Sequence, residues 1–284
     1  KEWFENLRNQ GQEIRQRALN KLPELLEQLE KKCTENGIQV YWAETTDEAN
    51  QIVLDVMRKH QAHKMIKGKS MVSEEMHLNA FLGTHGIEAV ETDLGEFVVQ
   101  VGGDHPSHII TPIIHKGRED VARLFVERLG ASAEEVADVA AMTAFARRIL
   151  RERFLEAGLG ISGVNFGVAA TGSLCVVTNE GNGRLCTRLP PGHVALMGIE
   201  KVIPSINYLP VFLNLLARSG TAQKLTTYTH ILHGPAPGRH SGTPCLQHSI
   251  KRCPAPCERL VTQEAYQDSC DAIKAEAAAL SGTC

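Results

Sequence analysis

Two lysines flank a glycine in the segment Lys67-Gly68-Lys69-Ser70, which follows a short strand predicted at residues 64–66. Ser73 can cap the helix predicted next, because a serine oxygen accepts a hydrogen bond from a free N–H of the first turn. Backbone N–H groups, the positive end of the helix dipole and two ammonium groups would then face one point. The pattern favours an anion-binding loop, with a solvated basic turn as the alternative. It is not a P-loop, which needs glycine where this chain has His63.

Two later turns carry hydroxyl, carboxylate and guanidinium groups. Thr171-Gly172-Ser173 and residues 179–184 are typical of tight hairpin turns, and simple connections would explain both. On a functional interpretation, Glu180 could act as an acid or base, and Arg184 could pair with a carboxylate substrate. Together with the lysine loop and the loop around residue 107, these turns give the candidate ligand-binding residues Lys67, Lys69, Ser70, Ser107, His108, Thr171, Gly172, Ser173, Glu180, Asn182 and Arg184.

Histidines gather in the loop at residues 105–115, where His105 and His108 form a His-x-x-His pair. Such a pair could ligate a metal. Apart from Asp104, no carboxylate or cysteine lies at a companion spacing. We therefore favour capping or hydrogen bonding in this loop over metal binding.

Five of the eight cysteines lie in the last forty residues, and Cys253 and Cys257 form a C-x3-C pair. Bacterial ferredoxins hold clusters with C-x2-C-x2-C-x3-C-P, and this tail has no C-x2-C. We interpret the tail cysteines as chance clustering, with a non-standard metal site at Cys253 and Cys257 as the alternative. Cys175 and Cys186 fall in predicted strands and are expected to be buried packing residues.

The segment Gly158-Leu159-Gly160-Ile161-Ser162-Gly163 has the letters of a dinucleotide-binding fingerprint. That fingerprint needs a strand before it and a helix after it. Here a helix is predicted before the segment and a strand after it. We therefore predict a helix end and a turn, and no nicotinamide binding.

The elements that must position these residues alternate between strand and helix over residues 37–235. This order predicts an α/β domain with a mostly parallel sheet flanked by helices. The β-like runs 164–169, 174–178 and 184–187 predict an antiparallel hairpin insertion, and residues 1–36 an N-terminal helical segment in which Pro23 starts a second helix. Further strands are expected at 38–42, 87–90, 97–101, 194–199 and 226–232, and helices at 117–129, 132–155 and 204–218.

Residues 236–284 form a Cys- and Pro-rich tail that we expect to be irregular, although residues 258–280 could form one helix. Every strong strand–helix alternation lies before Pro235. We therefore expect residues 1–235 to fold as one domain without the tail.

The formal net charge of -3 gives no electrostatic case for nucleic-acid binding. No apolar run reaches the roughly 18 residues that a membrane span needs. The first residues, Lys1–Asn6, show no signal-peptide pattern, so we expect a cytoplasmic protein without a membrane span.

Five segments, 67–75, 86–96, 106–116, 160–166 and 197–202, resemble the LUD-domain family, most closely its iron–sulfur lactate-utilisation B branch. The resemblance covers roughly residues 1–235. It implies a core similar to the sugar-phosphate isomerase and CoA-transferase-like α/β fold. It also implies a small carboxylate or phosphate ligand, and a part in the bacterial oxidation of L-lactate to pyruvate, in a complex with other lactate-utilisation subunits.

Two departures from the family pattern bear on function. Full-length relatives carry 4Fe–4S clusters in a C-terminal ferredoxin-like region, but no cluster-ligating run follows Pro235, so we predict no cofactor for this chain. Ala170 stands where the family usually has an acidic residue. The chain could therefore be an oxidoreductase subunit, a non-catalytic binding or scaffold subunit, or a carboxylate- or phosphate-binding enzyme on the same fold.

Overall fold

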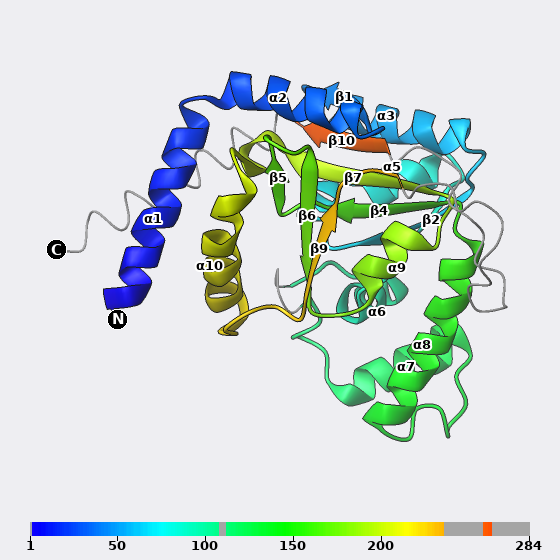
Figure 1. Cartoon of the computed structure of the whole chain (residues 1–284). Coiled ribbons are helices and arrows are strands. Elements are labelled where there is room, and N and C mark those ends of the chain that lie inside the picture. Colours follow the sequence, from blue (N-terminus) through cyan, green and yellow to red (C-terminus); the bar gives the residue numbers. More distant parts are fainter. Residues whose placement is uncertain (1, 108–111, 236–257, 263–284) are drawn as a thin grey trace, which may run out of the picture.

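A six-stranded parallel sheet forms the centre of the computed structural model, which describes residues 2–107, 112–235 and 258–262 (Figure 1). The strands lie in the order β1-β10-β7-β4-β2-β3, and every neighbouring pair is parallel. Their bounds are β1 (Gln39–Ala43), β2 (Lys64–Gly68), β3 (Glu88–Glu91), β4 (Leu159–Gly163), β7 (Gly192–Gly198) and β10 (Glu258–Thr262).

Alternate residues of a strand point to opposite faces of the sheet, and helices cover both faces. Met65 and Ile161 pack under α3 (Thr46–Lys59) and under the short helices α4 (Met71–Glu75) and α5 (Leu78–Thr84). Ile66 and Val90 pack on the other face with Cys186. The helices on that face are α6 (Leu94–Gly102), α7 (Arg118–Leu129), α8 (Val139–Glu156) and α9 (Asn182–Arg188).

A second, four-stranded sheet lies beside the first, in the order β8-β5-β6-β9. β5 (Phe166–Val168) and β6 (Ser173–Thr178) form the predicted antiparallel hairpin. β9 (Tyr228–Leu232) extends it antiparallel to β6, and β8 (Val202–Ile203) runs parallel to β5. Short 3-10 turns at Ile199–Lys201 and Ile206–Tyr208 flank β8.

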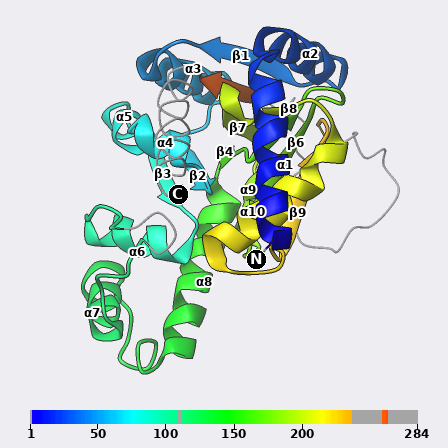
Figure 2. The same ribbon diagram turned by 90° about the vertical axis from the view of Figure 1, so that its left-hand side faces the viewer.

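Three helices pack on this second sheet: α1 (Glu2–Leu19), α2 (Leu22–Glu35) and α10 (Leu209–Thr221). The two views agree that α1 and α10 lie side by side (Figures 1 and 2). Arg15 of α1 fixes this arrangement. Its guanidinium lies over the ring of Phe212, 4.8 Å from the centroid, and donates a 2.5 Å hydrogen bond to the carbonyl of Glu200.

The α/β class, the parallel sheet and the two N-terminal helices are confirmed, and Pro23 lies in the first turn of α2. Two predicted strands are wrong. Residues 97–101 belong to the helix α6, and residues 184–187 belong to α9. Both runs are short and apolar or β-branched, and such runs cannot be assigned by periodicity alone.

Two helix starts also differ from prediction. Ser70, not Ser73, caps α4, and its Oγ accepts from the N–H of Ser73 at 3.1 Å. Ser132 and Glu135 exchange the hydrogen bonds expected of a capping box, yet α8 begins only at Val139, after Asp138.

The predicted helix over residues 258–280 is wrong at its start, because residues 258–262 form β10. The remainder of that segment lies outside the described residues. β10 pairs with β1 on one side and β7 on the other, so the tail supplies an inner strand of the main sheet.

Candidate functional site

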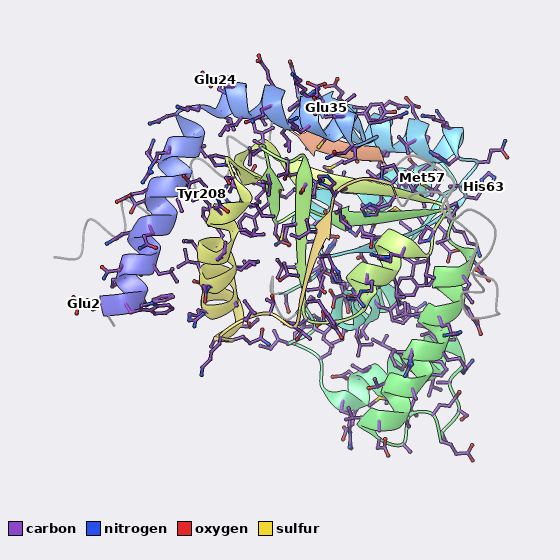
Figure 3. All side chains as sticks on the ribbon, viewed as in Figure 1. Glu2, Glu24, Glu35, Met57, His63 and Tyr208 are labelled. Carbon is purple, nitrogen blue, oxygen red and sulfur yellow. The ribbon has the colours of Figure 1, made fainter. Side chains whose placement is uncertain are left out.

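The order of the main sheet places a topological switch point where β2 and β4 end, and we call the residues around it (67–70, 74, 91–96 and 180–182) the crevice. From β2 the chain crosses through α4 and α5, on one face, to β3. From β4 it goes through the second sheet and α9, on the other face, to β7. Adjacent strands whose connections leave in opposite directions define a topological switch point, where ligands of open α/β sheets bind. His63 precedes β2, so it lies at the opposite end of the strand from this crevice (Figure 3).

Lys67 lies on β2 as a buried side chain and not in a loop. Its Nζ lies 2.7 Å from Glu91 Oε1 at the end of β3 and also pairs with Glu74 of α4. Asn79 Nδ2 donates to the same Glu91 oxygen at 2.6 Å. Burial lowers the pKa of the Lys67 ammonium, but Glu91 and Glu74 together raise it above its ordinary value. Lys67 is therefore an internal counter-ion that a ligand does not reach.

Lys69 directly follows β2, with a left-handed backbone (φ 59°) that is uncommon outside glycine. Its Nζ pairs with Asp93, which precedes α6, and lies 2.7 Å from Glu180 Oε2. Burial lowers the pKa of this ammonium, but Asp93 and Glu180 raise it above its ordinary value. Lys69 is thus charged, and two carboxylates of this chain hold it.

The crevice is acidic overall. Two lysines face five carboxylates, so the excess is three negative charges when all are ionised. Burial, together with Glu91 and Asp93, raises the pKa of Glu96 to about 7, so this carboxyl is partly protonated at neutral pH. The five carboxylates are Glu74, Glu91, Asp93, Glu96 and Glu180.

A cluster of uncharged polar side chains lies on the other face of β2, under α9. A side chain at Gly68 would meet Thr92 Oγ1 at 2.9 Å and Asn182 Nδ2 at 3.3 Å. Asn182 Nδ2 also lies 3.3 Å from Thr92 Oγ1. Asn182 Oδ1 is buried and has no hydrogen-bond partner among the described residues. On the same face, Ser162 Oγ of β4 lies 2.9 Å from His193 Nε2 of β7.

The structure brings together five of the residues predicted for the site: Lys67, Lys69, Ser70, Glu180 and Asn182. Thr171, Gly172 and Ser173 lie elsewhere. The carbonyl of Thr171 accepts from Asn36 at the end of α2, the missing side chain of Gly172 would meet the backbone of Lys32, and Ser173 Oγ lies 2.9 Å from His233 Nδ1.

The remaining predicted residues have other surroundings. The guanidinium of Arg184 lies over the ring of Tyr228, 5.4 Å from its centroid. Ser107 Oγ lies 2.7 Å from His115 Nδ1 in an exposed loop. His108, Cys253 and Cys257 lie outside the described residues. Sequence reasoning missed Glu91, Thr92 and Asp93, although their position directly after a predicted strand was an available signal.

The turn predicted at Gly158–Gly163 is wrong, because residues 159–163 form β4. The element order still differs from that of the dinucleotide fingerprint, since α8 precedes the segment and the strand β5 follows it. A side chain at Gly160 would lie 2.0 Å from the carbonyl oxygen of Cys186. Gly160 therefore allows α9 to rest directly on the sheet, which is a packing role.

Iron–sulfur clusters need cysteine thiolates, and the described cysteines do not suit one. Cys33, Cys175 and Cys186 are buried on α2, β6 and α9. Burial raises the pKa of Cys175 and of Cys186 to about 12, which keeps both thiols protonated. Within the described ranges, no group of three or more His, Cys, Asp or Glu side chains could hold a metal ion.

Comparison with known proteins shows the family. The sequence pattern of the LUD domain matches residues 26–240, which is more than half of the chain. The chain belongs to the LUD-domain family. The resemblance noted from the sequence is therefore confirmed. No helix in the described part of this LUD-domain protein is long and apolar enough to cross a membrane.

Curated relatives have names that refer to lactate and electron transport. "Lactate utilization protein B" of Bacillus cereus (strain AH820) is 45% identical over 228 residues, which cover 80% of this chain and 48% of the relative. "Uncharacterized electron transport protein YkgF" of Escherichia coli (strain K12) is 44% identical over 247 residues, covering 87% and 52%. The chain spans about half the length of these relatives.

Among solved structures, a DUF162 family protein from Deinococcus radiodurans aligns with 85% of this chain and 98% of its own, with a TM-score of 0.43 and 8% identity. At this level nothing further follows from the likeness.

Proposed function

We propose that this chain is the LUD portion of a lactate-utilisation protein and takes part, with partner subunits, in the oxidation of lactate to pyruvate. The observation that carries the proposal is the 45% identity to a lactate utilization protein B over 228 residues. Identity of this extent along one domain supports a shared role for that domain.

The chemistry of the crevice supports a model in which this chain binds lactate and accepts a proton, while a partner subunit accepts the electrons. Oxidising lactate to pyruvate removes two protons and two electrons, and the substrate carries a carboxylate throughout. Lys69 supplies a charged amine in the crevice, and Glu96, whose pKa lies at about 7, is suited to accepting a proton near neutral pH. The electrons need an acceptor, which we assign to a partner subunit, in keeping with the electron-transport name of the E. coli relative.

A non-catalytic binding or scaffold role is the second candidate. The favouring observation is that both lysines already have carboxylate partners within the chain. On this alternative the domain positions partner subunits and does not contact lactate.

A chimera tests the proposal. In a B. cereus strain lacking lactate utilization protein B, the segment of the relative that aligns with this chain is replaced by residues of this chain. We expect growth on L-lactate as the carbon source. A chimera that accumulates as folded protein but does not support growth would overturn the shared role. A Lys69→Gly chimera that grows as well as the parent chimera would favour the scaffold alternative.

A further inference from the structure

We infer that Lys69 is the anchor for the carboxylate of a small 2-hydroxy or 2-oxo acid, and that Glu180 occupies the ligand's place until the ligand displaces it. The choice of acid rests on the proposed function. The exchange itself rests on the geometry around Lys69.

The two lysines of the crevice differ in access. The Lys67 side chain is 2% exposed and lies between Glu91 and Glu74. The Lys69 side chain is 24% exposed, so solvent and small ligands approach it far more readily than Lys67. Lys69 is therefore the lysine of this crevice that can meet a ligand carboxylate.

The two carboxylate partners of Lys69 also differ in how exposed their side chains are. Asp93 is 18% exposed and is fixed at the start of α6. Glu180 is 54% exposed and lies in the turn before α9. An ion pair with one partner so exposed contributes little to stability. Displacing Glu180 into water therefore costs far less than displacing Asp93.

The turn that carries Glu180 keeps its shape without this ion pair. Thr178 Oγ1 donates to the carbonyl of Glu180 at 2.8 Å, and Asn179 Oδ1 accepts from the N–H of Thr227 at 3.1 Å. These contacts use the backbone and a neighbouring amide, not the Glu180 carboxylate. The carboxylate can leave Lys69 while the turn stays in place.

The negative charge of the crevice favours a ligand that replaces Glu180 over a ligand that binds in addition to it. The crevice has an excess of three carboxylates, so an added anion would be repelled by Glu96, Asp93 and Glu91. A ligand carboxylate that replaces Glu180 leaves the charge around Lys69 unchanged. Binding by exchange avoids the repulsion that opposes binding by addition.

Asn182 gives a second, independent indication of a ligand. It lies two residues after Glu180, is 8% exposed, and faces Gly68, the residue before Lys69. Its Oδ1 has no partner among the described residues. A buried acceptor without a donor is unfavourable. This oxygen is enclosed in the present structure, so we expect the hydroxyl of a 2-hydroxy acid on Lys69 to supply the donor only after Glu180 has been displaced.

Calorimetric titration of the full chain with L-lactate and with pyruvate tests the exchange. Glu180→Gln removes the competing charge and should tighten the binding of both acids by up to about five-fold. Lys69→Gly removes the ammonium while suiting the left-handed backbone, and should abolish binding. Glu13→Gln, which removes an exposed ion pair with Arg17 on α1, is the matched control and should bind like the parent.

Unchanged or weaker binding in Glu180→Gln, with an unchanged melting temperature, would show that Glu180 is only a surface contact and would overturn the exchange. Retained binding in Lys69→Gly would overturn the anchor, and circular dichroism of that variant confirms that it is folded. These results are separable from the growth experiment. Growth of the chimera without tighter binding in Glu180→Gln rejects the exchange alone, and the reverse rejects the lactate-utilisation role alone.

Discussion

At the residue scale, the charges around Lys67 and Lys69 come from segments that lie far apart in the chain. All three residues Lys67, Lys69 and Ser70 were predicted in a loop after a strand; Lys69 and Ser70 follow β2, whereas Lys67 lies within it. Their counter-ions Glu91 and Asp93 lie more than twenty positions later in the chain. Only the parallel pairing of β2 with β3 brings them beside the lysines. The sequence of a segment gives the charge of that segment alone. The register between strands determines which charged side chains become neighbours.

Replacing Lys67 should be far more damaging than replacing Lys64 on the same strand. Lys67→Met leaves Glu91 buried beside Asn79 without its cation, and losing one partner of a buried pair costs about 3–5 kcal/mol. Lys64→Met removes an exposed pair with Glu156, which contributes little to stability. Urea unfolding of both variants measures the difference. Equal losses would mean that Lys67 contributes no more than a surface lysine.

Glu96 should make stability fall as the pH rises. Its pKa is raised from 4.5 to about 7 by burial and by Glu91 and Asp93, so the folded protein holds this proton more tightly than the unfolded chain does. The contribution of Glu96 to stability is then fully present below about pH 4.5 and is lost as the pH rises through 7, by at most about 3 kcal/mol.

The substitution Glu96→Gln isolates this effect from other titrating groups. It should stabilise the protein at about pH 8 and have little effect at about pH 5. Glu152→Gln, at an exposed position of α8, is the control and should show no such difference. A Glu96→Gln variant with the same gain at both pH values would contradict the burial of this carboxyl.

At the element scale, strongly patterned segments were predicted correctly and short apolar ones were not. α2 and α7 have apolar residues at helical spacing and proline or glycine at their starts. The runs in α6 and α9 are apolar or β-branched over a few residues, which suits a buried helix and a strand equally. Tertiary packing, not local preference, makes them helices.

The close packing of α9 on β4 leads to a prediction for Gly160. A Cβ there would lie 2.0 Å from the backbone oxygen of Cys186, which can move only if α9 moves. Gly160→Ala should therefore destabilise the protein by roughly 1–3 kcal/mol or more. Gly83→Ala in α5 has nothing within 4 Å and is the control, expected to be stabilising by about 0.5–1 kcal/mol. Thermal unfolding distinguishes the two, and equal melting temperatures would show that α9 does not rest on β4.

At the scale of the whole molecule, the sheet is completed by a segment that the sequence did not indicate. Strand–helix alternation ends before Pro235, and residues 258–262 have no alternating pattern that would predict a strand. In the structure these residues pair with both β1 and β7. Among the described residues, β1 has no other strand partner. Long-range pairing of this kind is decided by the whole sheet and leaves little trace in local sequence.

Two truncations test whether the tail is dispensable, as the sequence suggested. A chain ending at Gly234 loses β10, so the backbone groups of β1 and β7 that pair with it lose their hydrogen bonds, and unpaired edges of this kind favour aggregation. A chain ending at Thr262 keeps β10 and removes only residues beyond it. We expect the shorter chain to melt at a lower temperature than the longer one, with less cooperativity, or to aggregate. If both melt alike, β1 must pair directly with β7 once β10 is gone, and residues 1–234 would then be a self-sufficient domain after all.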